Sequence, residues 1–230
     1  MKLEDHIFNA LLKYTKALSV ALGYRDLLTR LHSERVRALS VQIGEYCGLS
    51  NNEINALDIA ASFHDIGKIG IPDHILLKPS QLDEDEWKIM KQHSEIGEKI
   101  LASTELEGSQ QAALLIRHHH EHYNGIGYPD KLLGENIPIC SRIISIADSY
   151  DAMAVTRSYH RARTHPEIMA ILHEEIGGKH DPELMRVFCE IIETSNFKAE
   201  KSNPSINTDA GDKAAGAGYV RRWASLGEDS

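Results

Sequence analysis

The sequence lacks any apolar run approaching the roughly eighteen residues that identify a membrane-spanning helix. Its first residues also lack the order of a secretion signal, in which basic residues precede an apolar stretch. Cysteine is scarce: Cys47, Cys140 and Cys189 are scattered and odd in number, which argues against a disulfide framework. These absences predict a cytoplasmic protein with reduced thiols and no membrane span.

Positive charge is in deficit as well. The 230 residues include 34 acidic and 25 basic side chains, and the formal net charge is −9. That balance disfavours non-specific binding to duplex nucleic acid. If the substrate is a phosphate, local positive charge must come from bound metal ions and a few chosen lysine or arginine residues.

Stretches with the alternating pattern of a β-strand are missing, and apolar residues instead recur at helical spacing. The hydrophobic fraction of 42% is enough for a full core. We therefore predict an all-α fold, with an N-terminal helix in 1–19 and one domain over 20–197. Residues 198–230 are predicted to form a disordered tail, because their composition shifts to small and polar residues.

Local signals predict where the helices lie. Helices are expected from about Ser33 to near Gly48, from a Ser50 cap to His64, behind an acidic first turn at 83–86, over 110–122, over 140–157, near 165–176 and near 183–194. Pro72 and Pro79 predict a loop over 69–82. Two glycines and a proline exclude a helix at 124–129.

Histidine is abundant, with thirteen in the chain and eight of them between His32 and His122. Transition metals that hydrolyse phosphate esters favour imidazole nitrogen and carboxylate oxygen held on rigid elements. The candidate ligands are His32, His64, Asp65, His93, His119, His120 and Asp148.

Each candidate alone has an ordinary explanation. His32 fits a solvated helix start, His93 a surface position, and the run at 118–122 a weak metal-scavenging tract. Asp148 is more telling, because a carboxylate on an apolar helix face is costly unless it meets a cation. The joint occurrence of these residues on predicted helices is what indicates a metal site.

Two long segments resemble the signatures of a known family. Residues 64–73 read HDIGKIGIPD, and residues 119–129 read HHEHYNGIGYP. With shorter matches at 32–36, 147–152 and 181–184, they make the stretch from about 20 to 194 similar to an HD-GYP domain, a branch of the HD metal-dependent phosphohydrolases. The resemblance implies an HD-domain helical bundle with a Gly-Tyr-Pro loop beside a buried metal site. It also implies hydrolysis of cyclic di-GMP to the linear dinucleotide pGpG, and in some members onward to GMP.

The resemblance further implies roles for individual residues. One metal would be bound by His32, His64, Asp65 and Asp148; a second would be bound by His93, His119 and His120, with Asp65 bridging. Iron or manganese is expected at both positions. Family members with a third metal carry a glutamate four residues before the first ligand histidine, where this chain has Leu28, so two metals are expected.

Substrate-binding roles are carried over in the same way. Lys68 would contact the scissile phosphate, Tyr128 would line the pocket, and Arg157 and His160 would bind phosphate. Asp65 and Lys68 are the residues expected to be catalytic.

The expected mechanism would use two divalent ions about 3.5–4 Å apart that share a bridging water. The two ions would lower the pKa of this water, so that a hydroxide exists at neutral pH. This hydroxide would attack phosphorus in line with the leaving ribose 3′-oxygen. The metals and Lys68 would offset the developing negative charge.

Three departures from the family pattern bear on function. Asn124 replaces the usual aspartate before the first glycine of the second signature, which could loosen the loop. His160 stands where a second arginine is usual, and it is only partly charged at neutral pH, which could shift the preference among cyclic dinucleotides. Residues 1–19 are too short for a fused sensor domain, so regulation is expected from a GGDEF-type or other protein partner, or from a homodimer.

Two alternatives stay open. The first is a phosphohydrolase for another nucleotide, such as cyclic GMP-AMP. The second is a non-catalytic module that binds cyclic di-GMP or docks onto another protein. The intact turn at 127–129 favours a cyclic dinucleotide, and the retention of all seven candidate ligands favours catalysis.

Overall fold

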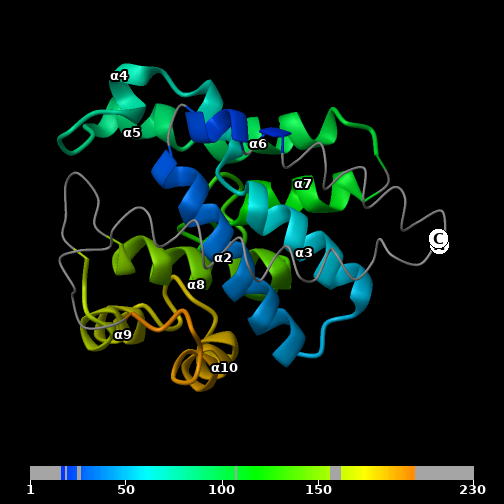
Figure 1. Cartoon of the computed structure of the whole chain (residues 1–230), viewed down its shortest axis with the longest axis vertical. Helices are drawn as coiled ribbons and strands as arrows, with labels where there is room; N and C mark the ends of the chain where they lie inside the picture. The colour runs from blue at the N-terminus through cyan, green and yellow to red at the C-terminus, as the bar shows by residue number, and fades with distance from the viewer. Residues whose placement is uncertain (1–16, 19, 25–26, 107, 156–161, 200–230) are drawn as a thin grey trace, which may run out of the picture. The chain divides into compact units, whose positions relative to one another are not determined.

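The computed structural model describes residues 17–18, 20–24, 27–106, 108–155 and 162–199. Within these residues the chain is helical, and extended pairing is limited to two isolated bridges, Asn124–Leu133 and Ile176–His180 (Figure 1). The all-α prediction is therefore confirmed. The predictions that fall on 1–16, on Arg157 and His160, and on the tail from residue 200 onward lie outside the described residues.

Nine α-helices and two 3₁₀ helices (η) are delimited within the described part of the chain. They are α2 (Leu27–Tyr46), α3 (Asn51–Phe63), η1 (Ile66–Gly70), α4 (Asp73–Leu76), α5 (Glu84–Met90), α6 (His93–Ala102), α7 (Ser109–His118), η2 (Gly134–Asn136), α8 (Ile139–Ala154), α9 (His165–Glu174) and α10 (Pro182–Ile192). In the described residues, no helix has the length and apolar character required to cross a membrane.

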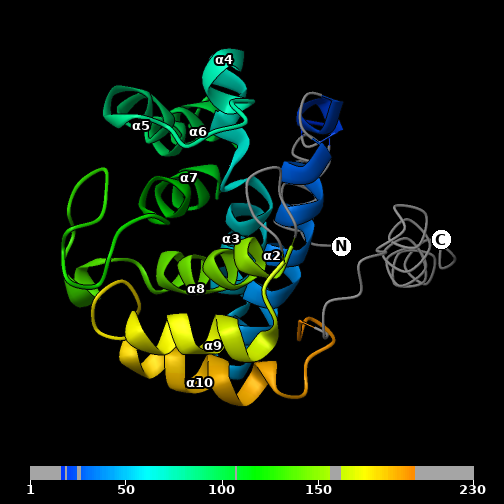
Figure 2. The same ribbon diagram turned by 90° about the vertical axis from the view of Figure 1, so that its left-hand side faces the viewer.

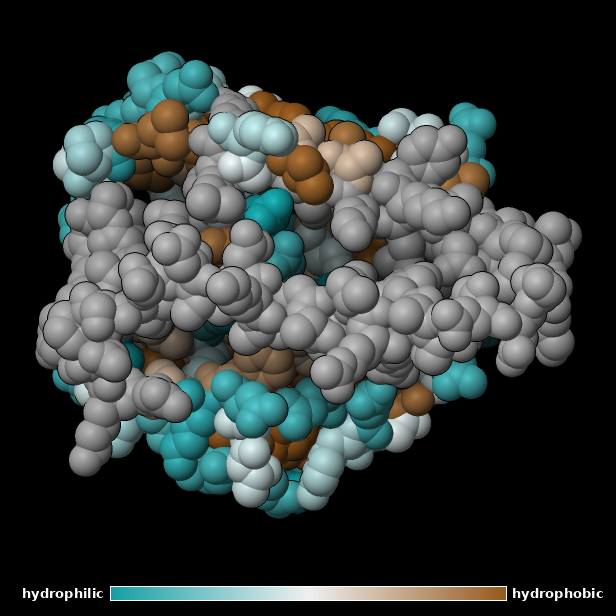
Figure 3. Space-filling model, in the orientation of Figure 1, coloured by the Kyte–Doolittle hydropathy of each residue, from teal (hydrophilic) through white to brown (hydrophobic). Residues whose placement is uncertain are grey.

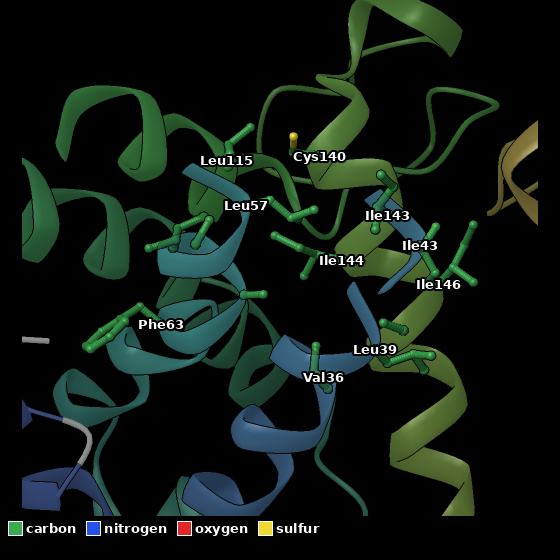
Figure 4. Packing of buried hydrophobic residues seen from close by; sticks show 14 of the residues in the cluster. Val36, Leu39, Ile43, Leu57, Phe63, Leu115, Cys140, Ile143, Ile144 and Ile146 are labelled. Atoms are coloured by element: carbon green, nitrogen blue, oxygen red, sulfur yellow. The ribbon is translucent and has the colours of Figure 1, made fainter. Parts of the chain in front are cut away.

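The core lies where α2, α3 and α8 meet (Figure 4). Its side chains are almost completely buried, and they include Val36, Leu39 and Ile43 from α2, Leu57 and Phe63 from α3, and Ile143, Ile144 and Ile146 from α8. Burying one such side chain stabilises the fold by about 1.5–3 kcal/mol. Helix α2 carries His32, α8 carries Asp148, and His64 follows the end of α3 directly, so the core fixes these residues relative to one another.

The remaining helices lie on two sides of this core. Figure 2 shows α4, α5, α6 and α7 to one side of α8, and the paired helices α9 and α10 to the other. Gly67 in η1 approaches α6 so closely that a Cβ atom there would lie 1.8 Å from the carbonyl oxygen of His93. Only glycine permits this approach, which brings the segment after Asp65 against the start of α6.

Apolar surface is exposed beside α4 and α5, where hydrophobic residues are visible in Figure 3. Leu77, directly after α4, is 56% exposed and Trp87 in α5 is 47% exposed. Single exposed apolar residues are normal on protein surfaces.

Several helix ends differ from the prediction. Helix α2 begins at Leu27 instead of Ser33, because Ser33 is a buried residue inside the helix and does not cap it. The predicted loop over 69–82 contains the end of η1 and the single turn α4. The helix predicted over 110–122 ends at His118, since the chain turns at His119 and His120.

The caps are better predicted than the ends. Ser50 caps α3 through a reciprocal pair of hydrogen bonds with Glu53, as expected. Asp83 and Glu86 form the same arrangement at the acidic first turn of α5. The helix expected behind that turn is interrupted at Lys91 and Gln92, because the amide of Gln92 bonds the carbonyl oxygen of Ile89 and closes α5 in a tighter turn.

Candidate metal centre

The seven predicted ligand residues come from segments far apart in the sequence, and the structure brings them together. Two groups have ligand atoms that all lie within 4.8 Å of one another: His32, His64 and Asp148, and His93, His119 and His120. Asp65 lies between the groups, with one carboxylate oxygen 3.6 Å from Nε2 of His64 and the other 3.6 Å from Nε2 of His93. These clusters could hold metal ions.

Three of the histidines are oriented by the same local contact. Nδ1 of His64, His93 and His119 bonds the carbonyl oxygen of the residue three positions earlier, at 2.8, 2.8 and 2.6 Å. A carbonyl oxygen only accepts, so Nδ1 carries the proton in each ring and Nε2 keeps its lone pair. This is the tautomer in which a histidine binds a metal through Nε2.

The lone pairs of these rings lack donors. Nε2 of His64 is buried and has no hydrogen-bond partner among the described residues. Nε2 of His93 and Nε2 of His119 lie 3.4 Å apart, and neither can carry the proton that a hydrogen bond would need. Buried acceptors without donors are costly unless a cation meets them. The residues therefore fit divalent metal ions, and a nitrogen and carboxylate donor set without thiolate suits Fe, Mn, Co, Ni or Zn.

The charge states also match those of ligands. Burial lowers the pKa of His64 and His93, and burial with the neighbouring histidines lowers the pKa of His119 to about 3. Burial alone would raise the pKa of Asp65, but Lys68 and the surrounding histidines hold it well below its usual value. The rings of His64, His93 and His119 are therefore neutral at neutral pH, and the carboxylate of Asp65 is ionised.

His32 is held differently, by carboxylates on both sides. Its Nε2 is 2.9 Å from Asp148, and its Nδ1 is 2.7 Å from Asp151. Burial lowers the pKa of His32, but these two carboxylates outweigh burial and raise it to about 9. In this arrangement the ring is protonated, so a metal ion at Nε2 would replace the proton that points at Asp148.

Asp151 and Arg35 are functional candidates that were not among the residues predicted from the sequence. Arg35 donates from Nε and from its second terminal nitrogen to the two oxygens of Asp151, at 2.7 and 2.9 Å. Asp151 in turn orients the ring of His32. The signal was available, because Asp151 follows Asp148 by three residues on the same apolar helix, where a carboxylate needs a cation.

The centre opens on one side. His120 and Asp148 keep partial exposure, whereas His32, His64, Asp65, His93 and His119 are buried. The ring of Tyr128 lies against His120, with ring centroids 4.9 Å apart. Burial and the carboxylates of Asp148 and Asp65 raise the pKa of Tyr128, so its phenol stays protonated. Nζ of Lys68 lies 2.6 Å from Asp65.

The loop that carries Tyr128 is fixed against the backbone of the histidine run. The amide of Tyr128 donates to the carbonyl oxygen of His120 at 3.2 Å. A Cβ atom at Gly127 would lie 2.2 Å from the amide nitrogen of His122, so only glycine fits there. Asn124 accepts a hydrogen bond from the amide of Ile126 through Oδ1, at 3.2 Å, and so closes the turn without the usual aspartate.

Glu121 fixes the far end of this loop. It is buried, and its two carboxylate oxygens accept the amide hydrogens of Asp130 and Leu132 at 2.6 and 3.1 Å. The near end is tied to the α9–α10 connection, since the amides of Tyr123 and Asn124 donate to carbonyl oxygens there. Glu121 was not among the residues predicted from the sequence to have a role.

Comparison with known proteins identifies the fold family. The model of the HD domain family matches residues 16–184. The cyclic di-GMP phosphodiesterase response regulator RpfG of Xanthomonas campestris is 42% identical over 165 residues, which cover 72% of this chain and 44% of that protein. The 3′3′-cGAMP-specific phosphodiesterase 2 of Vibrio cholerae is 37% identical over 173 residues, which cover 75% and 33%.

A solved structure agrees at the level of the fold. An HDG"Y"P protein from Bdellovibrio bacteriovorus superposes with a TM-score of 0.59 at 19% identity, over 82% of this chain and 63% of that one. The chain belongs to the HD domain family, and its two signatures resemble those of the HD-GYP branch. It spans less than half the length of the two curated relatives described above.

Proposed function

We propose that this chain is a metal-dependent phosphodiesterase that hydrolyses cyclic di-GMP to linear pGpG, and onward to GMP if the linear product binds again. The observation that carries the proposal is the convergence of seven nitrogen and oxygen donors with three imidazoles locked in the metal-binding tautomer. The name of the relative from Xanthomonas campestris supports cyclic di-GMP as the substrate.

Two divalent ions, iron or manganese, are the proposed cofactors. His32, His64, Asp65 and Asp148 would hold one ion and His93, His119 and His120 the other, with Asp65 shared because its two oxygens face both groups. When bound, such ions supply Lewis acidity at a phosphodiester and an activated water for attack on phosphorus.

The chain's own residues would bind and orient the substrate. Lys68 lies beside Asp65 at the shared position, where its ammonium can also donate to the phosphate under attack. The protonated phenol of Tyr128 is a hydrogen-bond donor at the open side, and its ring is a flat surface for a base. Arg157 and His160 remain proposed phosphate ligands from the sequence.

Cyclic GMP-AMP is the second candidate substrate. The relative from Vibrio cholerae is named for specificity toward that dinucleotide at a similar level of identity. A regulatory protein partner of GGDEF type, a homodimer and a cytoplasmic location also remain proposals.

The first experiment measures metal content and turnover together, on protein purified anaerobically without chelators. About two metals per chain, with pGpG or GMP formed from cyclic di-GMP, is the expected result. Cyclic GMP-AMP should be assayed in parallel, and faster turnover of it would reverse the order of the two substrates. Bound metal with tight cyclic di-GMP binding and no turnover would favour the non-catalytic module. No stoichiometric metal would overturn the proposed centre.

Replacing Asp65 tests the shared position. Asp65→Ala should abolish metal binding and turnover together, because both proposed ions lose a ligand. Asp58→Ala is the matched control, since Asp58 lies on α3 and pairs with Arg37 outside the cluster. Full activity in the Asp65 variant would make the site assignment wrong.

A further inference from the structure

Lys91 lies at the open side of the metal centre, and the proposed function gives it no role. It stands in the two-residue break between α5 and α6, two positions before His93. Its Nζ is 5.8 Å from the centroid of the Tyr128 ring. The same ring lies against His120. One aromatic side chain therefore contacts both the ammonium group of Lys91 and a member of the metal cluster.

The position of Lys91 is fixed from both ends of the break. Its amide donates to the carbonyl oxygen of Trp87 at 3.0 Å, which ends α5. The carbonyl oxygen of Met90, the residue before it, bonds Nδ1 of His93 at 2.8 Å. The backbone that carries the ammonium group is therefore built into the same turn that orients a proposed metal ligand.

The charge of Lys91 is available for a ligand. Neighbouring lysines on this side are paired, Lys78 with Glu86 and Lys88 with Asp85, whereas no carboxylate of the described residues lies within ion-pair distance of Lys91. Its side chain is partly exposed. A cation over the face of a tyrosine at an exposed site is held weakly, so the ammonium group is free to turn toward an anion.

The second phosphodiester of a cyclic dinucleotide is a suitable ligand for this cation. Such a dinucleotide carries two phosphodiesters, and only one of them can occupy the reacting position between the metals and Lys68. The second negative charge needs a cation in a chain whose net charge is −9. Arg157 and His160, proposed from the sequence, lie outside the described residues, and Lys91 offers a cation among the residues that the structure describes. We propose that Lys91 is a further substrate-binding residue whose ammonium group binds the phosphodiester that is not being cleaved.

This inference rests on the proposed function. It implies that Tyr128 and Lys91 act as one subsite, in which the ring supports a base and the ammonium group meets the adjoining phosphate. Lysine suits this role because it acts as a point charge on a flexible stem and needs no fixed hydrogen-bond geometry.

The test is the steady-state kinetics of metal-loaded protein with cyclic di-GMP. Lys91→Gln should raise KM by about tenfold or more, because a hydrogen bond to a charged group is lost, while kcat changes by less than about threefold. The dependence of KM on salt concentration should weaken, since one phosphate contact is gone. Lys91→Arg keeps the charge and should restore KM to within about threefold of the wild type.

Lys88→Gln is the matched control, because Lys88 lies three residues earlier on α5 and is exposed and paired with Asp85. Its KM and salt dependence should equal those of the wild type. Metal content should be the same in all these proteins. Bis(p-nitrophenyl) phosphate, which has a single phosphodiester, serves as a second substrate, and the loss in Lys91→Gln should be confined to the dinucleotide.

The outcomes separate this inference from the proposed function. A wild-type protein that neither binds nor hydrolyses any cyclic dinucleotide defeats the proposed function. A wild-type protein that turns over cyclic di-GMP, with a Lys91→Gln variant of equal KM, defeats the role of Lys91 alone. Equal losses on both substrates, or a loss of metal, would assign Lys91 to the reacting phosphate or to the structure of the centre and would overturn the inference.

Discussion

At the scale of single residues, His32 depends on a neighbour that does not belong to the metal cluster. Asp151 accepts the Nδ1 proton of His32, and Arg35 holds both oxygens of Asp151. This arrangement fixes the ring so that Nε2 points at Asp148. An outer carboxylate of this kind commonly contributes 10- to 100-fold to metal affinity.

We therefore expect Asp151→Asn to lower metal affinity by about 10- to 100-fold, because a neutral amide orients the ring of His32 and raises its basicity less than a carboxylate does. Chelator competition followed by metal analysis would measure the change. Asp58→Asn alters another Arg–Asp pair, formed between α2 and α3, and should leave metal affinity unchanged. If the Asp151 variant binds metal as tightly as the wild type, the hydrogen bond from His32 to Asp151 does not contribute to metal binding.

The residues of the cluster could be predicted from the sequence, but the reason that they meet could not. A histidine followed by aspartate at 64–65 and a histidine run at 118–120 are visible in the chain. The hydrogen bonds that select the tautomer of His64 and His93 depend on how each helix ends or begins, which spacing does not specify. Asp151 could have been inferred from the helix face that it shares with Asp148. Glu121 could not, because the amides that bond it, at 130 and 132, belong to the following loop, and the sequence does not show where that loop folds.

At the scale of the elements, the loop over 124–129 and the end of α7 form one unit through Gly127. A Cβ atom at this position would lie 2.6 Å from both Cα of Glu121 and the carbonyl oxygen of His120. These are backbone atoms of the metal-binding segment, so they cannot move without moving His120. The contact thus couples the signature loop to the proposed second metal position.

Gly127→Ala should destabilise the protein by about 1–3 kcal/mol or more and weaken metal binding, because the added methyl group forces the two backbones apart. Thermal unfolding and metal titration would measure both effects. Gly178→Ala is the control, since a Cβ atom there meets its nearest neighbour at 3.5 Å. An alanine variant of Gly127 that keeps wild-type stability and metal affinity would contradict the coupling.

Helix identity was predictable and helix ends were less so. The cap at Ser50 is local chemistry, and it lies where expected. The end of α7 at His118 is set by tertiary contacts, since Glu121 and the backbone after His119 bond the signature loop. The break at Lys91 is also invisible in the apolar pattern, because both residues of the break are ordinary helix formers.

At the scale of the whole molecule, buried histidines make folding sensitive to pH in two opposite directions. Burial lowers the pKa of His64, His93 and His120 as well as His119. Below about pH 6.5 these histidines bind protons in the unfolded chain but stay neutral in the folded chain, so the free energy of unfolding falls as pH falls. His32 acts in reverse: its stabilisation is complete below about pH 6.5 and is lost as pH rises toward 9.

The effect of His32 and that of the buried neutral histidines can be separated in the metal-free protein, by measuring the free energy of unfolding in urea at a series of pH values. Between pH 6 and 5, the folded-state pKa of about 3 leaves His119 neutral, whereas the unfolded chain binds about one proton there. His119→Gln should therefore reduce the slope of the free energy of unfolding against pH by about 1.4 kcal/mol per pH unit in this interval. His32→Gln should leave that interval unchanged and remove the decline of stability between pH 7 and 9. If the slope between pH 6 and 5 is the same with and without His119, the buried ring is charged in the folded protein. It could not then offer the lone pair on which the proposed metal centre depends.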